Sequence, residues 1–427
     1  MATSYRSLLG QPVFRLLWTG ESAGRLGFQL ANFLLPLIAV TVLHESGTRV
    51  GVISTAQFVP VVLFALVAGA LAGRWPLRGL LVACNALRAG ALGFVVSMHA
   101  AVGLHFLHLI IAAAVVGVAT VFYDVAYQAS IPQIVPVEGL SRANGLMQAT
   151  YSVTQLAGPA LAGFLTQSLG MPVAVGTACA LFMGALLSFV AMPPLLQAHS
   201  SQAPASLAKS IRQGLGFVWR CRPLRDLCLQ AGVSNLLEQA FLTAFMVYSV
   251  RDLGMSGGTV GLVVGAGGVG ALVGSLTAPR IRRVRVGVLV STALPAAGLA
   301  FVLVPASITA FAGAAPPLML AFALNGAAVS VFNVYAVSLR QSIPPEELLG
   351  SATASYRLVS FGTFPIGALL GGTLIDAVGG VATLWLIALM LTVSLSMFFG
   401  SPLKGVPSIE QARVHGSRWT ASSRSEK

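Results

Sequence analysis

Residues 104–126 read LHFLHLIIAAAVVGVATVFYDVA, an almost uninterrupted run of apolar side chains. A helix of about 20 such residues crosses the ~30 Å hydrocarbon core of a lipid bilayer. Eleven further stretches of similar length and composition occur along the chain. The sequence therefore predicts an all-α membrane protein with twelve transmembrane helices. The expected spans are 14–41, 50–72, 79–99, 104–126, 143–166, 172–193, 226–249, 259–279, 286–305, 317–339, 351–373 and 381–400.

The composition excludes a water-soluble protein. Charged residues make up 9% of the 427 residues, against roughly 25% in soluble domains, and apolar residues make up 56%. The basic residues also alternate in position. All but four of the 25 Lys and Arg residues are assigned to one set of alternate gaps and termini; Arg49 and Arg251 lie in the other set, and Arg25 and Arg88 lie within spans. This positive-inside pattern predicts that both termini are cytoplasmic.

Several classes of function are disfavoured. The net charge of +13 lies at helix ends, where it indicates membrane topology rather than nucleic-acid binding. The four cysteines have no metal or disulfide spacing, and no catalytic constellation or cofactor site is found. Residues 265–270 satisfy G-x-G-x-x-G, but no acidic residue follows at the distance a dinucleotide site needs, so helix packing is the better interpretation.

The spans divide into two halves of six. We expect an N-terminal bundle at 1–193, a cytoplasmic linker at 194–225, a C-terminal bundle at 226–400 and a disordered cytoplasmic tail at 401–427. Short matching motifs after spans four and ten make the halves pseudo-repeats, which predicts two parallel six-helix bundles with the substrate near their interface. Within the linker, apolar residues at helical spacing predict a helix on the membrane surface, with a solvated linker as the alternative. These residues are Leu207, Ile211, Leu215 and Val218.

Ionisable residues within spans need partners or a task, because a charge at mid-membrane costs roughly 2.5 to 3.5 kcal/mol. Glu21 and Arg25 are four residues apart, so they share a helix face and form either a static ion pair or part of a substrate or proton site. Glu238 follows Asn235 by three residues and has no cation on its own helix. Burial favours the neutral form of a carboxyl group, so Glu238 is the preferred proton acceptor, with a helix-packing role as the alternative.

Other polar and aromatic side chains within the spans are candidates for a substrate cavity. Any one of them could equally make a hydrogen bond between helices. Together their aromatic and amide groups suit a bulky amphipathic ligand. The candidate cavity residues are Arg25, Asn32, Gln57, Tyr151, Gln155, Asn235, Phe241, Asn325, Asn333 and Tyr356.

The chain resembles the major facilitator superfamily, in particular the macrolide and siderophore exporters among its drug:proton antiporters. The resemblance covers 14–400 and rests on FRLLW at 14–18, YDVAYQA at 123–129 and VSLRQ at 337–341. The fifth span also fits the spacing of the family's antiporter motif. Its positions are Gly145, Gly158, Pro159 and Gly163, with Thr154 and Ala162 where the family usually has glycine.

The resemblance also implies a cytoplasmic gate, in which Asp124 would pair with Arg74 or Arg78; direct proton transfer by Asp124 is the alternative. Three acidic residues of the family pattern are absent. Gly73 precedes Arg74 where the family has aspartate, and Phe28 and Asn85 stand where many relatives have one.

We therefore expect a secondary active transporter of the inner or plasma membrane that exports hydrophobic or amphipathic small molecules, such as drugs or secondary metabolites. Alternating access and proton antiport would drive it, with Glu238 and possibly Glu21 carrying the proton. We expect a monomer in contact with membrane lipids, without a cofactor or metal. The missing acids keep two alternatives open: an uncoupled facilitator or lipid transporter of the same fold, and a transport-inactive sensor or partner protein.

Overall fold

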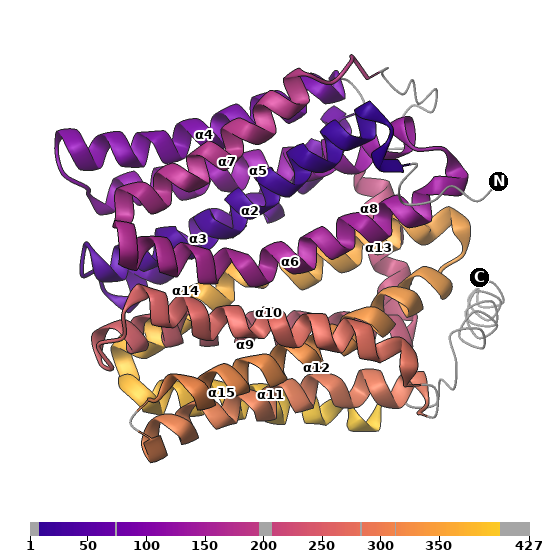
Figure 1. The fold of residues 1–427 in the computed structure, drawn as a ribbon. Helices are drawn as coiled ribbons and strands as arrows, with labels where there is room; N and C mark the ends of the chain where they lie inside the picture. The colour runs from indigo at the N-terminus through magenta and orange to yellow at the C-terminus, as the bar shows by residue number, and fades with distance from the viewer. Residues whose placement is uncertain (1–7, 73–74, 196–206, 282–283, 312, 402–427) are drawn as a thin grey trace. The chain divides into compact units, whose positions relative to one another are not determined.

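The computed structural model describes residues 8–72, 75–195, 207–281, 284–311 and 313–401. Over these ranges the chain is almost wholly helical and contains no strand. Figure 1 shows long helices joined by short connections. The expected tail beyond Ser401 lies outside the described residues.

The first six helices coincide with the first six predicted spans. Two of them extend well beyond the predicted apolar stretches, since α5 continues to Ile134 and α6 begins as early as Val137. The six are α2 (Pro12–Thr41), α3 (Gly47–Ala72), α4 (Leu77–Ala101), α5 (Phe106–Ile134), α6 (Val137–Leu169) and α7 (Met171–Val190).

The remaining helices begin with α8 (Leu207–Arg220), where an amphipathic helix was predicted. The predicted span 351–373 is divided between two helices, α13 and α14, by a break at Gly362 and Thr363. The helices after α8 are α9 (Arg222–Arg251), α10 (Gly257–Thr277), α11 (Val286–Phe311), α12 (Ala315–Ser342), α13 (Glu346–Phe361), α14 (Phe364–Val378) and α15 (Gly380–Ser396).

Each predicted span thus has its helix, and the all-α membrane fold is confirmed. Within the described ranges, 10 helical segments are long and apolar enough to cross a membrane, with α13 and α14 counted together. The two predicted spans not among them correspond to α6 and α9. Both carry charged residues towards their ends, such as Arg142 in α6 and Arg225 and Asp226 in α9.

Glycine sets the same sharp turn in both halves of the chain. Gly170 joins α6 to α7 with φ 83°, and Gly379 joins α14 to α15 with φ 82°. A side chain is strained in this left-handed region, whereas glycine adopts it freely. The two turns occupy equivalent places among the six helices of each half, in keeping with the predicted repeat.

The described residues cluster into two compact units, the first within 8–195 together with 249–265 and the second within 207–248 together with 266–401. In the first unit, α2 packs against α7 and α6, and α5 packs against α3 and α4. In the second, α11 packs against α12 and α15, and α8 packs against α13. The buried side chains that these packings create include several polar and charged ones, which define the candidate site.

Candidate functional site

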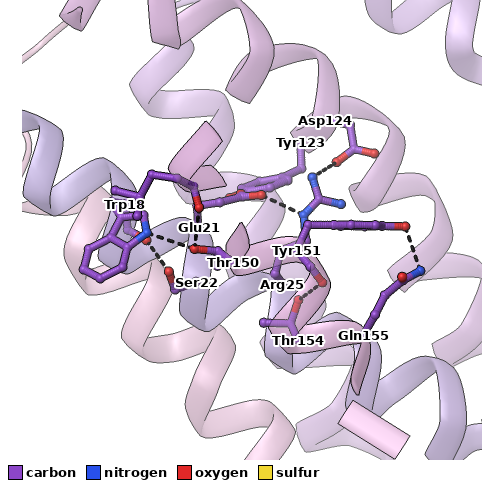
Figure 2. A network of polar contacts seen from close by, with 11 residues as sticks. Trp18, Glu21, Ser22, Arg25, Tyr123, Asp124, Thr150, Tyr151, Thr154 and Gln155 are labelled. Atoms are coloured by element: carbon purple, nitrogen blue, oxygen red, sulfur yellow. Dashed lines mark hydrogen bonds and ion pairs between the residues drawn. The ribbon is translucent and has the colours of Figure 1, made fainter. Parts of the chain in front are cut away.

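Two acids and an arginine meet inside the first unit. The Arg25 Nε atom donates to Glu21 Oε1 at 2.7 Å, one turn away on α2, and its Nη2 atom lies 3.5 Å from Asp124 Oδ1 on α5 (Figure 2). Glu21 is only 3% exposed. Its second oxygen accepts a hydrogen bond from the Tyr123 hydroxyl at 2.5 Å. Glu21 is therefore held by one donor on each carboxylate oxygen.

Arg88 on α4 completes this network from the other side of Tyr123. The guanidinium carbon lies 4.3 Å from the centroid of the Tyr123 ring and 5.5 Å from that of Phe182. Arg88 is 1% exposed, and its Nε atom has no hydrogen-bond partner among the residues described. Two aromatic faces thus stabilise this cation in place of a direct ion pair.

Arg88 was expected within a span, but neither Arg88 nor Tyr123 was predicted to belong to the site. The signal for Arg88 was present, because an arginine at the middle of an apolar helix is costly without compensation. Tyr123 gave no such signal, since it lies near the end of the predicted span 104–126 and tyrosine is common at such positions in membrane proteins. Its importance comes from the packing of α2, α4 and α5 around it.

The exposed side of Arg25 is lined by α6. The guanidinium carbon lies 5.4 Å from the centroid of the Tyr151 ring, and Gln155 Nε2 donates to the Tyr151 hydroxyl at 2.9 Å (Figure 2). About two turns before Arg25 on α2, Trp18 Nε1 donates to Thr150 Oγ1 at 3.0 Å, which ties α2 to the same helix. Three of the predicted cavity residues, Arg25, Tyr151 and Gln155, are therefore neighbours.

The family resemblance implies a cytoplasmic gate in which Asp124 pairs with Arg74 or Arg78. Asp124 lies against Arg25 instead of Arg78. Arg78 donates to the backbone carbonyls of Phe189, at 3.2 Å, and Val190, and so ties the start of α4 to the end of α7. Arg74 lies outside the described residues. The physical reason is proximity, since Arg25 reaches Asp124 across the α2–α5 contact.

Other predicted cavity residues of the first unit are more scattered. Gln57 on α3 is 2% exposed, and neither its amide nitrogen nor its amide oxygen has a partner among the described residues. Asn32 is half-buried on α2. In the antiporter motif, Gly145 is exposed, whereas Gly158 lies against Gln29 and Gly163 against Gly257 and Gly261 of the same unit, with Pro159 beside them on α6.

In the second unit, Glu238 lies on α9 beside two polar neighbours. The Ser234 hydroxyl donates to Glu238 Oε1 at 2.7 Å, and no cation lies within ion-pair distance in the described part of the chain. Asn235 Nδ2 donates to the Ser360 carbonyl at 2.8 Å and to its hydroxyl oxygen at 2.9 Å. The Ser360 carbonyl is near the end of α13, where the helix break releases it from the regular backbone pattern.

Three of the remaining predicted residues of this unit are buried, and the fourth is exposed. Phe241 is fully buried and stacks on Phe301, with ring centroids 4.1 Å apart. Asn325 Nδ2 donates to the Ala297 carbonyl at 3.2 Å, which joins α12 to α11. Tyr356 is buried beneath the Arg340 guanidinium at 4.6 Å, whereas Asn333 is exposed.

Comparison with known proteins identifies the class of this helical fold. The profile of the transmembrane secretion effector family, a branch of the major facilitator superfamily, matches residues 3–423. The chain belongs to this family. It is a multi-pass membrane protein of a transporter family rather than an enzyme, as predicted.

Relatives of this family member agree with that assignment. The multidrug efflux pump Tap of Mycobacterium tuberculosis is 25% identical over 361 residues, covering 82% of this chain and 84% of the pump. An uncharacterized MFS-type transporter, y4rN of Sinorhizobium fredii, is 29% identical over 253 residues, covering 57% of this chain and 60% of the relative.

Solved transporters share the fold at low sequence identity. The nucleoside transporter NupG aligns with a TM-score of 0.69 at 15% identity, covering 91% of this chain and 98% of NupG. The xylose transporter XylE of E. coli, in an inward-open conformation, gives a TM-score of 0.69 at 11% identity and covers 91% and 96% of the two chains. These likenesses show the major facilitator fold.

Proposed function

We propose that this chain exports hydrophobic or amphipathic small molecules, drugs among them, in exchange for protons by alternating access. The efflux activity named for the related Tap pump supports the direction and the substrate class. The positive-inside pattern supports cytoplasmic termini, and the similarity to a bacterial efflux pump supports a location in the plasma membrane. The two six-helix halves predicted from the sequence are the parts that alternate in such a cycle.

The observation that carries the proton-coupling part is the contrast between Glu238 and Glu21. Glu21 is held by Arg25 and by the Tyr123 hydroxyl, which both stabilise its ionised form. Glu238 has a serine hydroxyl as its partner and no cation among its described neighbours. A carboxyl group in an apolar span without a counter-charge takes up a proton more readily than one in an ion pair. Glu238 is therefore the principal proton carrier, and Glu21 mainly orders the network around Arg25.

Substrate recognition is assigned to the polar and aromatic surface around Arg25. Arg25, Tyr151 and Gln155 present a cation, an aromatic face and an amide within a few ångströms of one another. Such a combination binds an aromatic, partly polar molecule by stacking and by a small number of hydrogen bonds. The antiporter motif on α6 runs along the same helix, which connects this surface to the proposed exchange.

The test uses purified protein in liposomes with ethidium as an amphipathic probe and a pH-sensitive dye in the lumen. An imposed proton gradient should drive ethidium uptake, and ethidium should in turn drive proton movement. Glu238→Gln should abolish both. Glu45→Gln is the control. Glu45 lies in the short segment between α2 and α3, where it pairs with Arg49 at the start of α3, in the unit that does not contain Glu238. If Glu238→Gln leaves ethidium-driven proton movement at the wild-type rate, the coupling assignment is wrong.

An uncoupled facilitator is the second candidate, and the missing acids of the family pattern favour it. Gly73, Phe28 and Asn85 replace three acidic residues, and the Asn85 side chain is fully buried and donates to the Leu81 carbonyl at 2.8 Å. Under this alternative, ethidium flux follows its own gradient and ignores an imposed pH difference. The same liposomes distinguish the two functions without further variants.

A further inference from the structure

The linker helix α8 is packed tightly against α13. A Cβ atom built on Gly214 would overlap the Ser351 carbonyl group and approach the Ser355 hydroxyl oxygen to 2.8 Å. Val218, one turn further along α8, is 2% exposed on the same face. Only glycine at 214 permits this approach of the two backbones. The linker helix α8 is therefore held against α13.

Helix α13 can act as a lever between that contact and the helix break. Ser351, under Gly214, and Ser360 are nine residues apart, which is about 13.5 Å along a helix at ~1.5 Å per residue. The helix runs without interruption between them and ends at Phe361, and Gly362 and Thr363 separate it from α14. A displacement of α13 at Ser351 is therefore carried to Ser360.

The far end of the lever meets α9 beside Glu238. Asn235 donates from one amide nitrogen to both the carbonyl and the hydroxyl oxygen of Ser360. Thr363 Oγ1 donates to the same carbonyl at 2.9 Å. The end of α13 is therefore bonded both to α9 and to the residue that precedes α14. The residue before Asn235 is Ser234, whose hydroxyl holds the Glu238 carboxylate.

We propose that Asn235 is a positioning residue for Glu238, through which the linker helix α8 and the lever α13 set the placement of that carboxylate. The proposal rests on the proposed role of Glu238 as the proton carrier. Any movement of the linker between the two halves then alters the surroundings of the carboxyl group, which would couple the transport cycle to protonation. Gly214 is the contact at which the linker acts.

Labelling of Glu238 by dicyclohexylcarbodiimide provides a test that needs no transported substrate. This reagent adds to protonated carboxyl groups in apolar surroundings, and mass spectrometry of the peptides measures its rate at each acid. The variants are Gly214→Ala, Asn235→Ala and their combination. Gly216→Ala is the matched control, since Gly216 lies on the same helix and a Cβ there would meet nothing within 4 Å. Labelling of Glu21, in the other unit, is the internal control.

We expect Gly214→Ala and Asn235→Ala each to raise the labelling rate of Glu238 about tenfold, because a displaced Ser234 hydroxyl no longer stabilises the charged carboxylate and losing a hydrogen bond to a charged group changes an equilibrium by about that factor. The double variant should be no faster than either single one, because both changes act along one path. Gly216→Ala should match the wild type, and the Glu21 rate should not change. If Gly214→Ala behaves as Gly216→Ala, or if the two effects multiply, the proposal is overturned.

Folding of each variant is checked by gel filtration and thermal unfolding in detergent. Should Gly214→Ala fail to fold, Val218→Ala loosens the same face of α8 more gently, with the exposed Trp219→Ala as its control. Val218→Ala must then raise the Glu238 rate and Trp219→Ala must leave it unchanged; equal rates overturn the proposal. The outcome is independent of the ethidium experiment, which judges the role of Glu238 itself.

Discussion

The ring of Tyr123 covers the guanidinium of Arg88 at 4.3 Å, while its hydroxyl donates a hydrogen bond to Glu21. One side chain thus compensates a buried cation on α4 and a buried anion on α2. The two charges belong to two different helices that both contact α5, so Tyr123 is the link between them. The stability of the first unit should depend on this link.

Replacing Tyr123 by phenylalanine removes the hydroxyl and keeps the ring over Arg88. We expect Tyr123→Phe to lower the free energy of unfolding by about 1.5 to 3 kcal/mol, the usual contribution of a hydrogen bond to a charged group. Thermal unfolding in detergent measures the effect. Tyr127→Phe is the matched control, since the buried Tyr127 hydroxyl has no partner among the residues described and its ring stacks on Tyr123. Equal unfolding temperatures for the two variants would contradict the role of Tyr123.

Replacing Arg88 by methionine keeps most of the side-chain volume and removes the charge. Among the described residues, the network then retains Glu21 and Asp124 against Arg25 alone, which leaves a net negative charge inside the first unit. We expect a loss of about 3 kcal/mol or more, because leaving one member of a buried charge set uncompensated costs roughly 3 to 5 kcal/mol. Adding Glu21→Gln restores neutrality and should recover part of the loss in the same unfolding assay. A more stable Arg88→Met variant would show that the Tyr123 face does not balance this charge.

The spans could be predicted because the length of an apolar run is a local property. The predicted 79–99 and the observed α4, Leu77–Ala101, differ by two residues at each end. The Glu21–Arg25 contact also follows from spacing, because residues four apart share a helix face. Arg88, Tyr123 and Asp124 could not be assembled in this way, since their meeting depends on how α2, α4 and α5 rotate and pack. The break after Phe361 was missed because the apolar pattern continues through it.

The approach of α5 to α3 gives a test of packing near Gln57. A Cβ atom built on Gly117 would overlap the Gln57 carbonyl oxygen and lie 3.1 Å from Pro60 Cγ. We expect Gly117→Ala to separate the helices and to cost about 1 to 3 kcal/mol, as overpacking does. Gly93→Ala is the control, since the nearest atom to its added Cβ would be Cys179 Sγ at 4.0 Å. Thermal unfolding in detergent compares the stability of the two variants. A Gly117→Ala protein as stable as Gly93→Ala would mean that α3 and α5 separate without loss of stability.

Phe241 distinguishes packing from substrate contact in the second unit. The side chain is fully buried among Phe245, Phe301 and Phe322, although the sequence predicted a place on the cavity wall. We expect Phe241→Ala to lower the free energy of unfolding by about 3 to 5 kcal/mol, the cost of a large cavity in a packed core. Phe361→Ala should lower the free energy of unfolding much less, because the Phe361 side chain is partly exposed.

Ethidium uptake by the Phe241→Ala protein that remains folded should keep the wild-type KM, because a side chain enclosed by three phenylalanines cannot touch the transported molecule. A raised KM with an unchanged unfolding temperature would instead place Phe241 on the transport path, and would require the aromatic cluster to open during the cycle.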